Sequence, residues 1–295
     1  CLVGSEMCIR DRNSKVDFLY QPNQRHTIKF GFNYTYHEFT PGNASGRSGD
    51  VVFEPEEIFK QYSNEAAFYI SDDFDISDVL KVNAGLRYSY FQDLITDSIT
   101  GVKNGGKDYF GLEPRLTMRY KINPTSSIKA AYTQNYQYIH LASTSSVSLP
   151  TDLWIPSSAG IKPKFADQYA LGYFKNLKDN MYETSIEAYY KEMTNLIEYK
   201  EGVLPEDNTN SDSDDAFAFG DGDSYGVELL IKKNKGNTTG WIGYTLSKTT
   251  RYFDEVNEGN AFPAKYDRRH DLSITVSHNC LLYTSPSPRD KRQWG

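Results

Sequence analysis

Long stretches of the chain alternate strictly between apolar and polar residues, and this pattern limits the possible fold more than any other feature. Along 80–90 (LKVNAGLRYSY), one set of alternate positions is apolar or aromatic and the other is polar or small. The same alternation occurs in 28–37, 182–191 and 225–232. Successive side chains of a β-strand point to opposite faces, so a period of two predicts strands with one apolar and one polar face. We therefore predict an all-β fold.

The chain is predicted to contain about eleven strands. Their ranges are 13–20, 25–39, 60–76, 79–92, 109–122, 127–140, 165–176, 181–198, 224–234, 238–250 and 269–279. Most of them exceed the five or six residues that are usual in soluble sheets. A strand that crosses a membrane needs roughly 10 residues, so these strands are long enough to cross one and to protrude. Within them, Leu86 and Ile242 are assigned to the apolar, lipid-facing side.

The connections between these strands are alternately short and long. The short ones, at 21–24, 77–78, 123–126, 176–180 and 235–237, contain the Gly, Pro, Asn, Asp and Ser residues that favour tight turns. The others are loops of about 15 to 25 residues. An antiparallel up-and-down meander with its short turns at one end and its long loops at the other is typical of an outer-membrane β-barrel.

The overall composition agrees with such a barrel and excludes other classes. The mean hydropathy of -0.62 and the lack of a run of 18 apolar residues exclude transmembrane helices. Barrel strands are only half apolar, so they are compatible with this value. The net charge of -7 offers no basic stripe to a phosphate backbone, which argues against a nucleic-acid partner. Aromatic residues concentrate near strand ends, where their rings would form an interfacial girdle.

Pro114 lies inside one of the predicted strands. Proline has no N–H group to donate to a neighbouring strand, so we expect a β-bulge or the start of the strand at this position.

Both ends of the chain differ in composition from the rest, and they hold Cys1, Cys8 and Cys280, the three cysteines of the sequence. Codons can be chosen for 280–290 such that the complementary DNA strand, read in a shifted frame, encodes 2–11, and the resulting DNA sequence resembles an adapter used to prepare sequencing libraries. We therefore expect 1–12 and 280–295 to be foreign segments. The native part would then be 13–279, which has no cysteine for a disulfide or a thiolate metal site.

Several stretches resemble the C-terminal barrel of TonB-dependent outer-membrane receptors, particularly those of Bacteroidetes-like bacteria. The similar segments are 82–88 (VNAGLRY), 113–120 (EPRLTMRY), 161–173 (IKPKFADQYALGY), 186–199 (IEAYYKEMTNLIEY), 225–231 (YGVELLI), 240–248 (GWIGYTLSK) and 266–272 (YDRRHDL). They span nearly all of 13–279 in a consistent order. The similarity therefore rests on their arrangement rather than on any one motif.

This resemblance implies a fold and a function. Such receptors have a 22-stranded barrel, a globular plug inside it and a preceding segment that engages TonB. They use the proton-motive force of the inner membrane to import scarce ligands such as ferric siderophores, haem, cobalamin or glycans. About eleven strands would be half of such a barrel. The implied partners are outer-membrane lipid, TonB and a small-molecule or iron-chelate ligand, with a surface lipoprotein as a further candidate, and no catalytic activity is implied.

The best candidate for a ligand-binding site lies at the end of the predicted strand 127–140 and in the loop that follows it. Tyr136, Tyr138 and His140 share one face at strand spacing and lead into a loop that carries Asp152 and Trp154. Aromatic rings and a carboxylate are suited to stacking on, and hydrogen bonding with, a ring-bearing ligand. A simpler interpretation is that these residues form the transition from the aromatic girdle to the loop.

Other motifs give no support for a cofactor, a metal ion or catalysis. The five histidines lack the spacing of a metal site, and the sequence contains no GxSxG, Walker or GxGxxG motif. Energised import by a TonB-dependent receptor is therefore the main hypothesis. Two alternatives remain at this point: an unplugged porin or adhesin barrel, and a secreted β-sandwich that binds carbohydrate.

Overall fold

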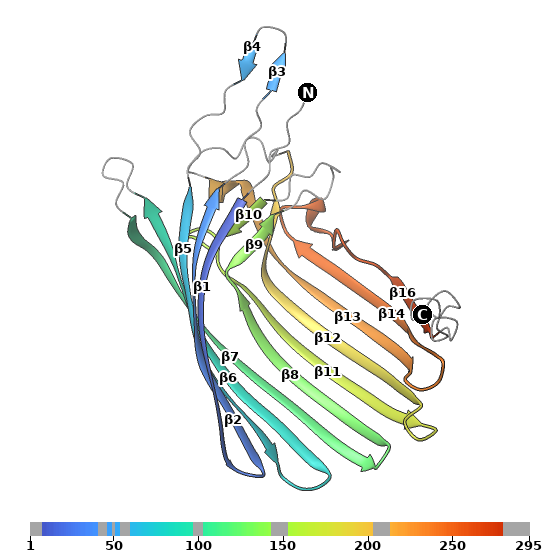
Figure 1. Ribbon diagram of the computed structural model, residues 1–295. Coiled ribbons are helices and arrows are strands. Elements are labelled where there is room, and N and C mark those ends of the chain that lie inside the picture. Colours follow the sequence, from blue (N-terminus) through green and yellow to red (C-terminus); the bar gives the residue numbers. More distant parts are fainter. Residues whose placement is uncertain are drawn as a thin grey trace, which may run out of the picture.

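The computed structural model describes residues 8–40, 46–48, 51–53, 60–96, 103–142, 153–202 and 213–279. Within these residues, twelve strands form one antiparallel sheet. Figure 1 shows this sheet as a curved, open wall of tilted strands, with tight turns at one end and long connections at the other. No helix in the described part of the chain is long and apolar enough to cross a membrane. The predicted all-β, up-and-down architecture is confirmed.

The wall consists of eleven long strands in sequence order. They are β1 (Cys8–Asn23), β2 (His26–Thr40), β5 (Gln61–Asp75), β6 (Leu80–Thr96), β7 (Lys103–Asn123), β8 (Ser126–Gln137), β11 (Lys164–Leu177), β12 (Tyr182–Tyr199), β13 (Phe217–Lys233), β14 (Thr238–Phe253) and β16 (His270–His278). Each corresponds to one of the predicted strands. The twelfth strand, β15 (Phe262–Pro263), extends the upper part of β14.

Short strands in the long connections were not predicted from the sequence. The strands β3 (Gly46–Ser48) and β4 (Val51–Phe53) form one hairpin, and β9 (Ile139–Ala142) and β10 (Leu153–Pro156) form another. Two 3-10 turns, η2 (Ser213–Ala216) and η3 (Asn257–Gly259), lie in later connections. Segments of two to four residues are too short to show a period in the sequence.

Some predicted boundaries were wrong. Strand β7 begins at Lys103 rather than 109, and β13 begins at Phe217 rather than 224. Both extensions contain adjacent polar or glycine residues (KNGGKD and FGDGD), so they lack the alternation of the lower wall. Main-chain pairing continues there because it does not depend on an apolar face.

Pro114 does not cause a bulge. Strand β7 runs through it, and Pro114 lies opposite Leu86 of β6 in an unbroken part of the register. On its other side, the pairing of β7 with β8 ends at Arg115 and Thr133. Pro114 therefore lies just beyond the last paired residue on the β8 side, where a missing N–H group leaves no gap in that ladder. The expected bulge or strand start was wrong for this reason.

Strand β1 includes Cys8–Asn23 and thus part of the segment 1–12 that we expect to be foreign. Its first residues continue the antiparallel register with β2, from Cys8 opposite Thr40. Main-chain hydrogen bonds along an edge are open to most sequences. The foreign origin of 1–12 and of 280–295 therefore stays a prediction, and the second segment lies outside the described residues.

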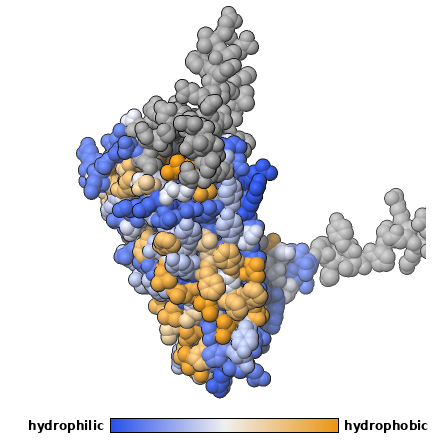
Figure 2. Space-filling model, turned by 90° about the vertical axis from the view of Figure 1, so that its left-hand side faces the viewer, coloured by the Kyte–Doolittle hydropathy of each residue, from blue (hydrophilic) through white to orange (hydrophobic). Residues whose placement is uncertain are grey.

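The two faces of the wall differ as the alternation predicts. Large apolar residues are exposed on one face, including Phe32, Phe68, Leu112, Leu171 and Leu229. Leu86 and Ile242, which were assigned to the lipid-facing side, are 42% and 48% exposed. Figure 2 shows the hydrophobic residues gathered in a broad zone below a hydrophilic zone. A β-sandwich would bury such a face between two layers, so the sandwich alternative was wrong.

The short turns are held by side chains that replace missing backbone partners. Asn23 accepts hydrogen bonds from the backbone N–H groups of Arg25 and His26, at 2.9 and 3.1 Å. Asn123 accepts one from the N–H of Thr125 at 2.9 Å. In the turn after β11, Lys178, Asp179 and Asn180 have φ values of 50°, 52° and 62°. Asn and Asp residues favour both such hydrogen bonds and the positive φ values of tight turns.

An extra residue in β12 reverses the faces of its upper end. The register with β13 shifts between Met193 and Leu196, and Asn195 has a φ of 57°. Its side-chain amide donates to the carbonyl oxygen of Pro163 at 3.0 Å. Below this bulge the even-numbered residues carry the exposed apolar side chains, for example Ile186 and Tyr190. Above the bulge, the even-numbered residues, such as Glu198, lie on the inner face.

Two buried apolar clusters lie at the loop end of the wall. One joins the β9–β10 hairpin to the tops of β12 and β13, through Ala142, Ile155, Ile161, Ile197, Tyr199 and Phe217. The other contains Leu196, Ala218, Phe253 and Val256. Burial of this kind is worth about 1.5–3 kcal/mol for each large side chain. The first cluster therefore fixes the short hairpin against the wall, and the second joins the tops of β12, β13 and β14.

A charge on the exposed apolar face should destabilise the protein in a lipid bilayer. We expect Leu86→Arg and Ile242→Arg each to lower the free energy of unfolding by about 2–4 kcal/mol. Thr245→Arg is the matched control, because Thr245 belongs to the same strand as Ile242 but lies on the opposite face, between Glu228 and Asp271. Urea unfolding of the complete barrel in lipid vesicles measures the difference. Equal effects of all three substitutions would contradict the assignment of the faces.

Candidate functional site

The upper end of β8 separates from β7, and the residues at its end lie against the inner face of β6 and β7. Its pairing with β7 ends at Thr133, although its pairing with β11 continues to Gln137. A Cβ atom on Gly111 of β7 would lie 2.6 Å from the ring of Tyr136 and 2.7 Å from the hydroxyl of Tyr138. Gly111 thus permits the close approach of both rings. The prediction of one strand through 127–140 was wrong, because the chain turns away at Tyr138.

Tyr138 is the centre of this arrangement, and only 3% of its surface is exposed. Its ring stacks on Phe91 with 5.0 Å between the centroids and 4° between the planes. Its hydroxyl lies 2.7 Å from the hydroxyl of Ser89, which donates a hydrogen bond of 2.8 Å to Glu113. Ser89 therefore accepts from Tyr138. A buried hydroxyl needs such a partner, so this chain fixes the ring.

Glu113 connects the tyrosine to a network of charges on the inner face. Only 5% of its side chain is exposed, and Arg87 and Arg115 approach its two carboxylate oxygens at 3.6 and 3.4 Å. Arg87 also lies 3.7 Å from Glu65 of β5. A buried carboxylate is costly unless it is paired and hydrogen-bonded, and these contacts supply its partners. The network therefore holds β5, β6 and β7 in fixed positions below the aromatic rings.

Tyr136 continues the row of rings toward β11. Its ring centroid lies 6.4 Å from that of Tyr138 and 5.0 Å from that of Phe165. The phenyl ring of Phe165 is tilted by 55° relative to it. Tyr136 is half-buried. The rings of Phe91, Tyr136 and Phe165, from three strands, and that of Tyr138, between β8 and β9, thus form a continuous aromatic surface.

His140 is completely buried in the β9–β10 hairpin. Its Nε2 atom shares a hydrogen bond of 2.9 Å with the hydroxyl of Ser157, while Nδ1 has no hydrogen-bond partner. Burial, and to a smaller extent the positive charge of Lys164, lower the pKa of His140 to about 3. The imidazole is therefore neutral at physiological pH and acts as part of the packing of the hairpin.

Trp154 of β10 lies opposite Leu141 of β9 and is 38% exposed. With Tyr136, Tyr138 and Glu65 it lines an open hollow of about 290 Å³. Ile9 and Asp11 also line this hollow, but they belong to the segment that we expect to be foreign. Asp152, the fifth predicted site residue, lies outside the described residues.

The structure thus brings four of the predicted residues into one region, with different environments. Tyr136, Tyr138 and Trp154 line the hollow, Tyr138 with little exposed surface, whereas His140 is buried within the β9–β10 hairpin and does not line it. Sequence reasoning missed Phe91, Ser89 and Glu113. Alternation placed Ser89 on the polar face, but the contact between Tyr138 and Ser89 depends on the departure of β8 from β7, which no local pattern encodes.

Replacing Gly111 by alanine should disturb the aromatic surface. The new methyl group would meet Tyr136, Ser89 and Tyr138 at less than normal contact distance, and overpacking of this kind costs about 1–3 kcal/mol. Gly243→Ala is the control, because its Cβ atom would meet side chains no closer than 3.3 Å. Urea unfolding compares the two variants. A Gly111→Ala protein as stable as the Gly243→Ala protein would contradict the described packing.

Acid should destabilise the protein through His140. The pKa of this histidine is lowered on folding, so the unfolded chain binds a proton first, and stability falls as the pH drops below about 6.5. The expected loss approaches about 1.4 kcal/mol per pH unit between pH 6.5 and about 3. His140→Gln should reduce this slope. Urea unfolding at a series of pH values measures it, and identical slopes for both proteins would exclude the effect.

Comparisons with known proteins agree with this architecture. Residues 9–286 match the family described as TonB dependent receptor-like, beta-barrel. None of the curated protein sequences compared with the chain matches it. Solved structures with a similar fold have a low sequence identity to this chain.

Three of these structures illustrate the similarity. The FrpB iron transporter from Neisseria meningitidis (F3-3 variant) has a TM-score of 0.64 and 14% identity, covering 94% of this chain and 41% of its own. The pyoverdine outer membrane receptor FpvA from Pseudomonas aeruginosa has a TM-score of 0.63 and 16% identity, covering 93% and 39%. The ferric-catecholate import receptor Fiu from E. coli has a TM-score of 0.58 and 12% identity, covering 92% and 42%.

The chain spans about two fifths of the length of these structures. Its eleven long strands, its exposed apolar face and its polar inner face are those of a barrel wall in the outer membrane. The family comprises receptors rather than enzymes. The match over residues 9–286 means that this chain belongs to the β-barrel family of the TonB-dependent receptors.

Proposed function

We propose that this chain is part of a receptor that imports a scarce ligand, of the ferric siderophore class, with energy supplied through TonB. The observation that carries this proposal is the family match over nearly the whole chain. The similar solved structures are an iron transporter, a pyoverdine receptor and a ferric-catecholate import receptor, which supports an iron chelate as the ligand.

Physical chemistry supports a larger parent protein. Among the described residues, β1 and β16 each pair with one neighbour in the wall. An unpaired strand edge in hydrocarbon leaves backbone groups without partners, at several kcal/mol each. About five groups on each edge would cost tens of kcal/mol, so a membrane-spanning wall must be closed by further strands. A 22-stranded barrel would supply these strands. The proposed receptor also has a plug and a TonB-engaging segment.

The hollow at the loop end is the proposed entrance for the ligand. Tyr136 and Trp154 present aromatic surface on its border, Tyr138 stacks on Tyr136, and His140 bonds Ser157 within the hairpin that carries Trp154. Aromatic rings favour ligands with flat, conjugated groups, such as the catecholate or chromophore rings of iron chelates. Asp152 is kept in the proposal as a residue of the same loop. The binding energy would then come from stacking, with polar groups fixing the orientation.

Removing the exposed ring should weaken import. We expect Trp154→Ala to lower the affinity for the imported iron chelate about 3- to 10-fold, which corresponds to one lost aromatic contact. The matched control is Trp241→Ala, because Trp241 is exposed to a similar degree on the wall strand β14. Uptake of radioactive iron by cells that produce the complete receptor measures the effect, with immunoblots of outer membranes to confirm equal amounts.

The same assay distinguishes the import hypothesis from the porin alternative. A receptor of this family should lose uptake in cells without TonB, whereas an unplugged porin would not. Uptake that is independent of TonB would contradict the proposed function. Equal uptake by the Trp154→Ala and Trp241→Ala receptors would remove the hollow from the proposal but leave energised import in place.

A further inference from the structure

A second hollow lies on the inner face of the wall, at the opposite end from the aromatic rings. It has a volume of about 230 Å³ and is bordered by the turn between β7 and β8. Three of its residues are basic: Arg119, Lys121 and Lys129. We propose that this hollow is a binding site for a small, multiply charged oxyanion, one that carries phosphate or carboxylate groups.

The register of the strands places these basic residues directly beside one another. Arg119 of β7 lies opposite Lys81 of β6 on one side and opposite Lys129 of β8 on the other. Lys121 follows two residues after Arg119 and therefore shares its face. Like charges in directly opposed positions destabilise a sheet. The repulsion between these basic residues thus remains unfavourable unless an anion binds between them.

The protein neutralises only the first member of this row. Lys81 forms an ion pair with Asp75 at 3.4 Å. Among the described residues, no carboxylate lies within ion-pair distance of Arg119, Lys121 or Lys129. Glu187, which comes two strands after Lys129 in the same row, instead accepts a hydrogen bond from Ser185 at 3.4 Å. Three positive charges therefore surround the hollow without an internal counter-charge.

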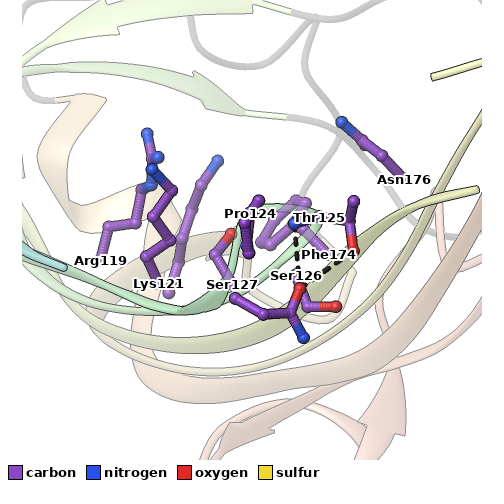
Figure 3. Close-up of a pocket in the computed structure, with 10 residues that line it drawn as sticks. Arg119, Lys121, Pro124, Thr125, Ser126, Ser127, Phe174 and Asn176 are labelled. Carbon is purple, nitrogen blue, oxygen red and sulfur yellow. Dashed lines mark hydrogen bonds between the residues drawn. The ribbon is translucent and has the colours of Figure 1, made fainter. Parts of the chain in front are cut away.

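The hollow is also shaped to hold a compact anion. Figure 3 shows Arg119 and Lys121 extending side by side from the strand that forms one border. The ammonium group of Lys129 lies 4.0 Å from the ring centroid of Phe174, and this cation–π contact fixes its position. The side-chain oxygen of Asn123 already accepts from both the N–H and the hydroxyl of Thr125, so it does not compete for the cations. A planar guanidinium beside two ammonium groups is the donor set that binds phosphate or carboxylate.

This site is separate from the aromatic hollow. Glu113, below the rings, and Arg119 are six residues apart on β7, which corresponds to roughly 20 Å along a strand. The anion site rests on the register and the charges alone. It would exist whether or not the receptor imports an iron chelate.

Lysine reactivity tests the proposal on the complete receptor folded in detergent micelles. The rate of acetylation of Lys121 and Lys129 is measured by mass spectrometry with and without inorganic phosphate or citrate, at constant ionic strength set by chloride. At an anion concentration about ten times the dissociation constant, we expect both rates to fall about tenfold. Lys178, exposed in the next turn, is the internal control and should react at an unchanged rate.

Substitution of the arginine separates binding from general charge effects. Arg119→Gln keeps both reporter lysines and should abolish most of the protection, whereas Arg268→Gln, at an exposed arginine elsewhere, should not alter it. Equal rates with and without either anion would overturn the proposal. Lysines that are already protected without added anion, and that react only in high salt, would also overturn it, because an acidic segment of the protein would then occupy the hollow. Neither result would affect the TonB test of import.

Discussion

The structure depends on the need of every backbone N–H and C=O group for a partner in a medium that offers none. The wall meets this need by antiparallel pairing from β1 to β16, except above Arg115 and Thr133, where the ladder between β7 and β8 ends. Once the register is fixed, each side chain is fixed to one face and to one row. Both proposed sites are consequences of these rows. The rings gather where β8 leaves its ladder, and the basic residues gather where the ladder is complete.

The lower and upper parts of the wall are stabilised by different interactions. The lower part exposes apolar side chains outward, so lipid rather than protein would cover them. The buried clusters of the described residues lie at the loop end, where the β9–β10 hairpin and the tops of β12, β13 and β14 pack together. Beside them, Tyr138, Ser89 and Glu113 form a buried polar chain. The loop end is therefore organised like the core of a soluble protein, and the strands below it like a membrane wall.

The sequence was sufficient to predict the wall but only part of the candidate site. Alternation placed Leu86 and Ile242 on the exposed face, and turn residues such as Asn23 and Asn123 marked the ends of strands. Both are local signals of a few residues. The stack of Tyr138 on Phe91 and the opposition of Arg119 and Lys129 depend on which residues face one another across strands. That information is absent from any single segment, which is why Ser89, Glu113 and the basic hollow were not predicted.

The extra residue at Asn195 has a consequence for how such a wall can change over time. Below it, the alternation of β12 must match the lipid, and any shift by one residue would turn apolar side chains inward. Above it, the odd- and even-numbered positions exchange faces. Glu198 therefore contacts Arg251 on the inner side, while Tyr199 packs into the apolar cluster on the other side. The alternation above the bulge, at the loop end of the strand, is thus independent of the alternation below it. Residues at the loop end can therefore vary without matching the apolar and polar alternation that the bilayer imposes on the strands beneath.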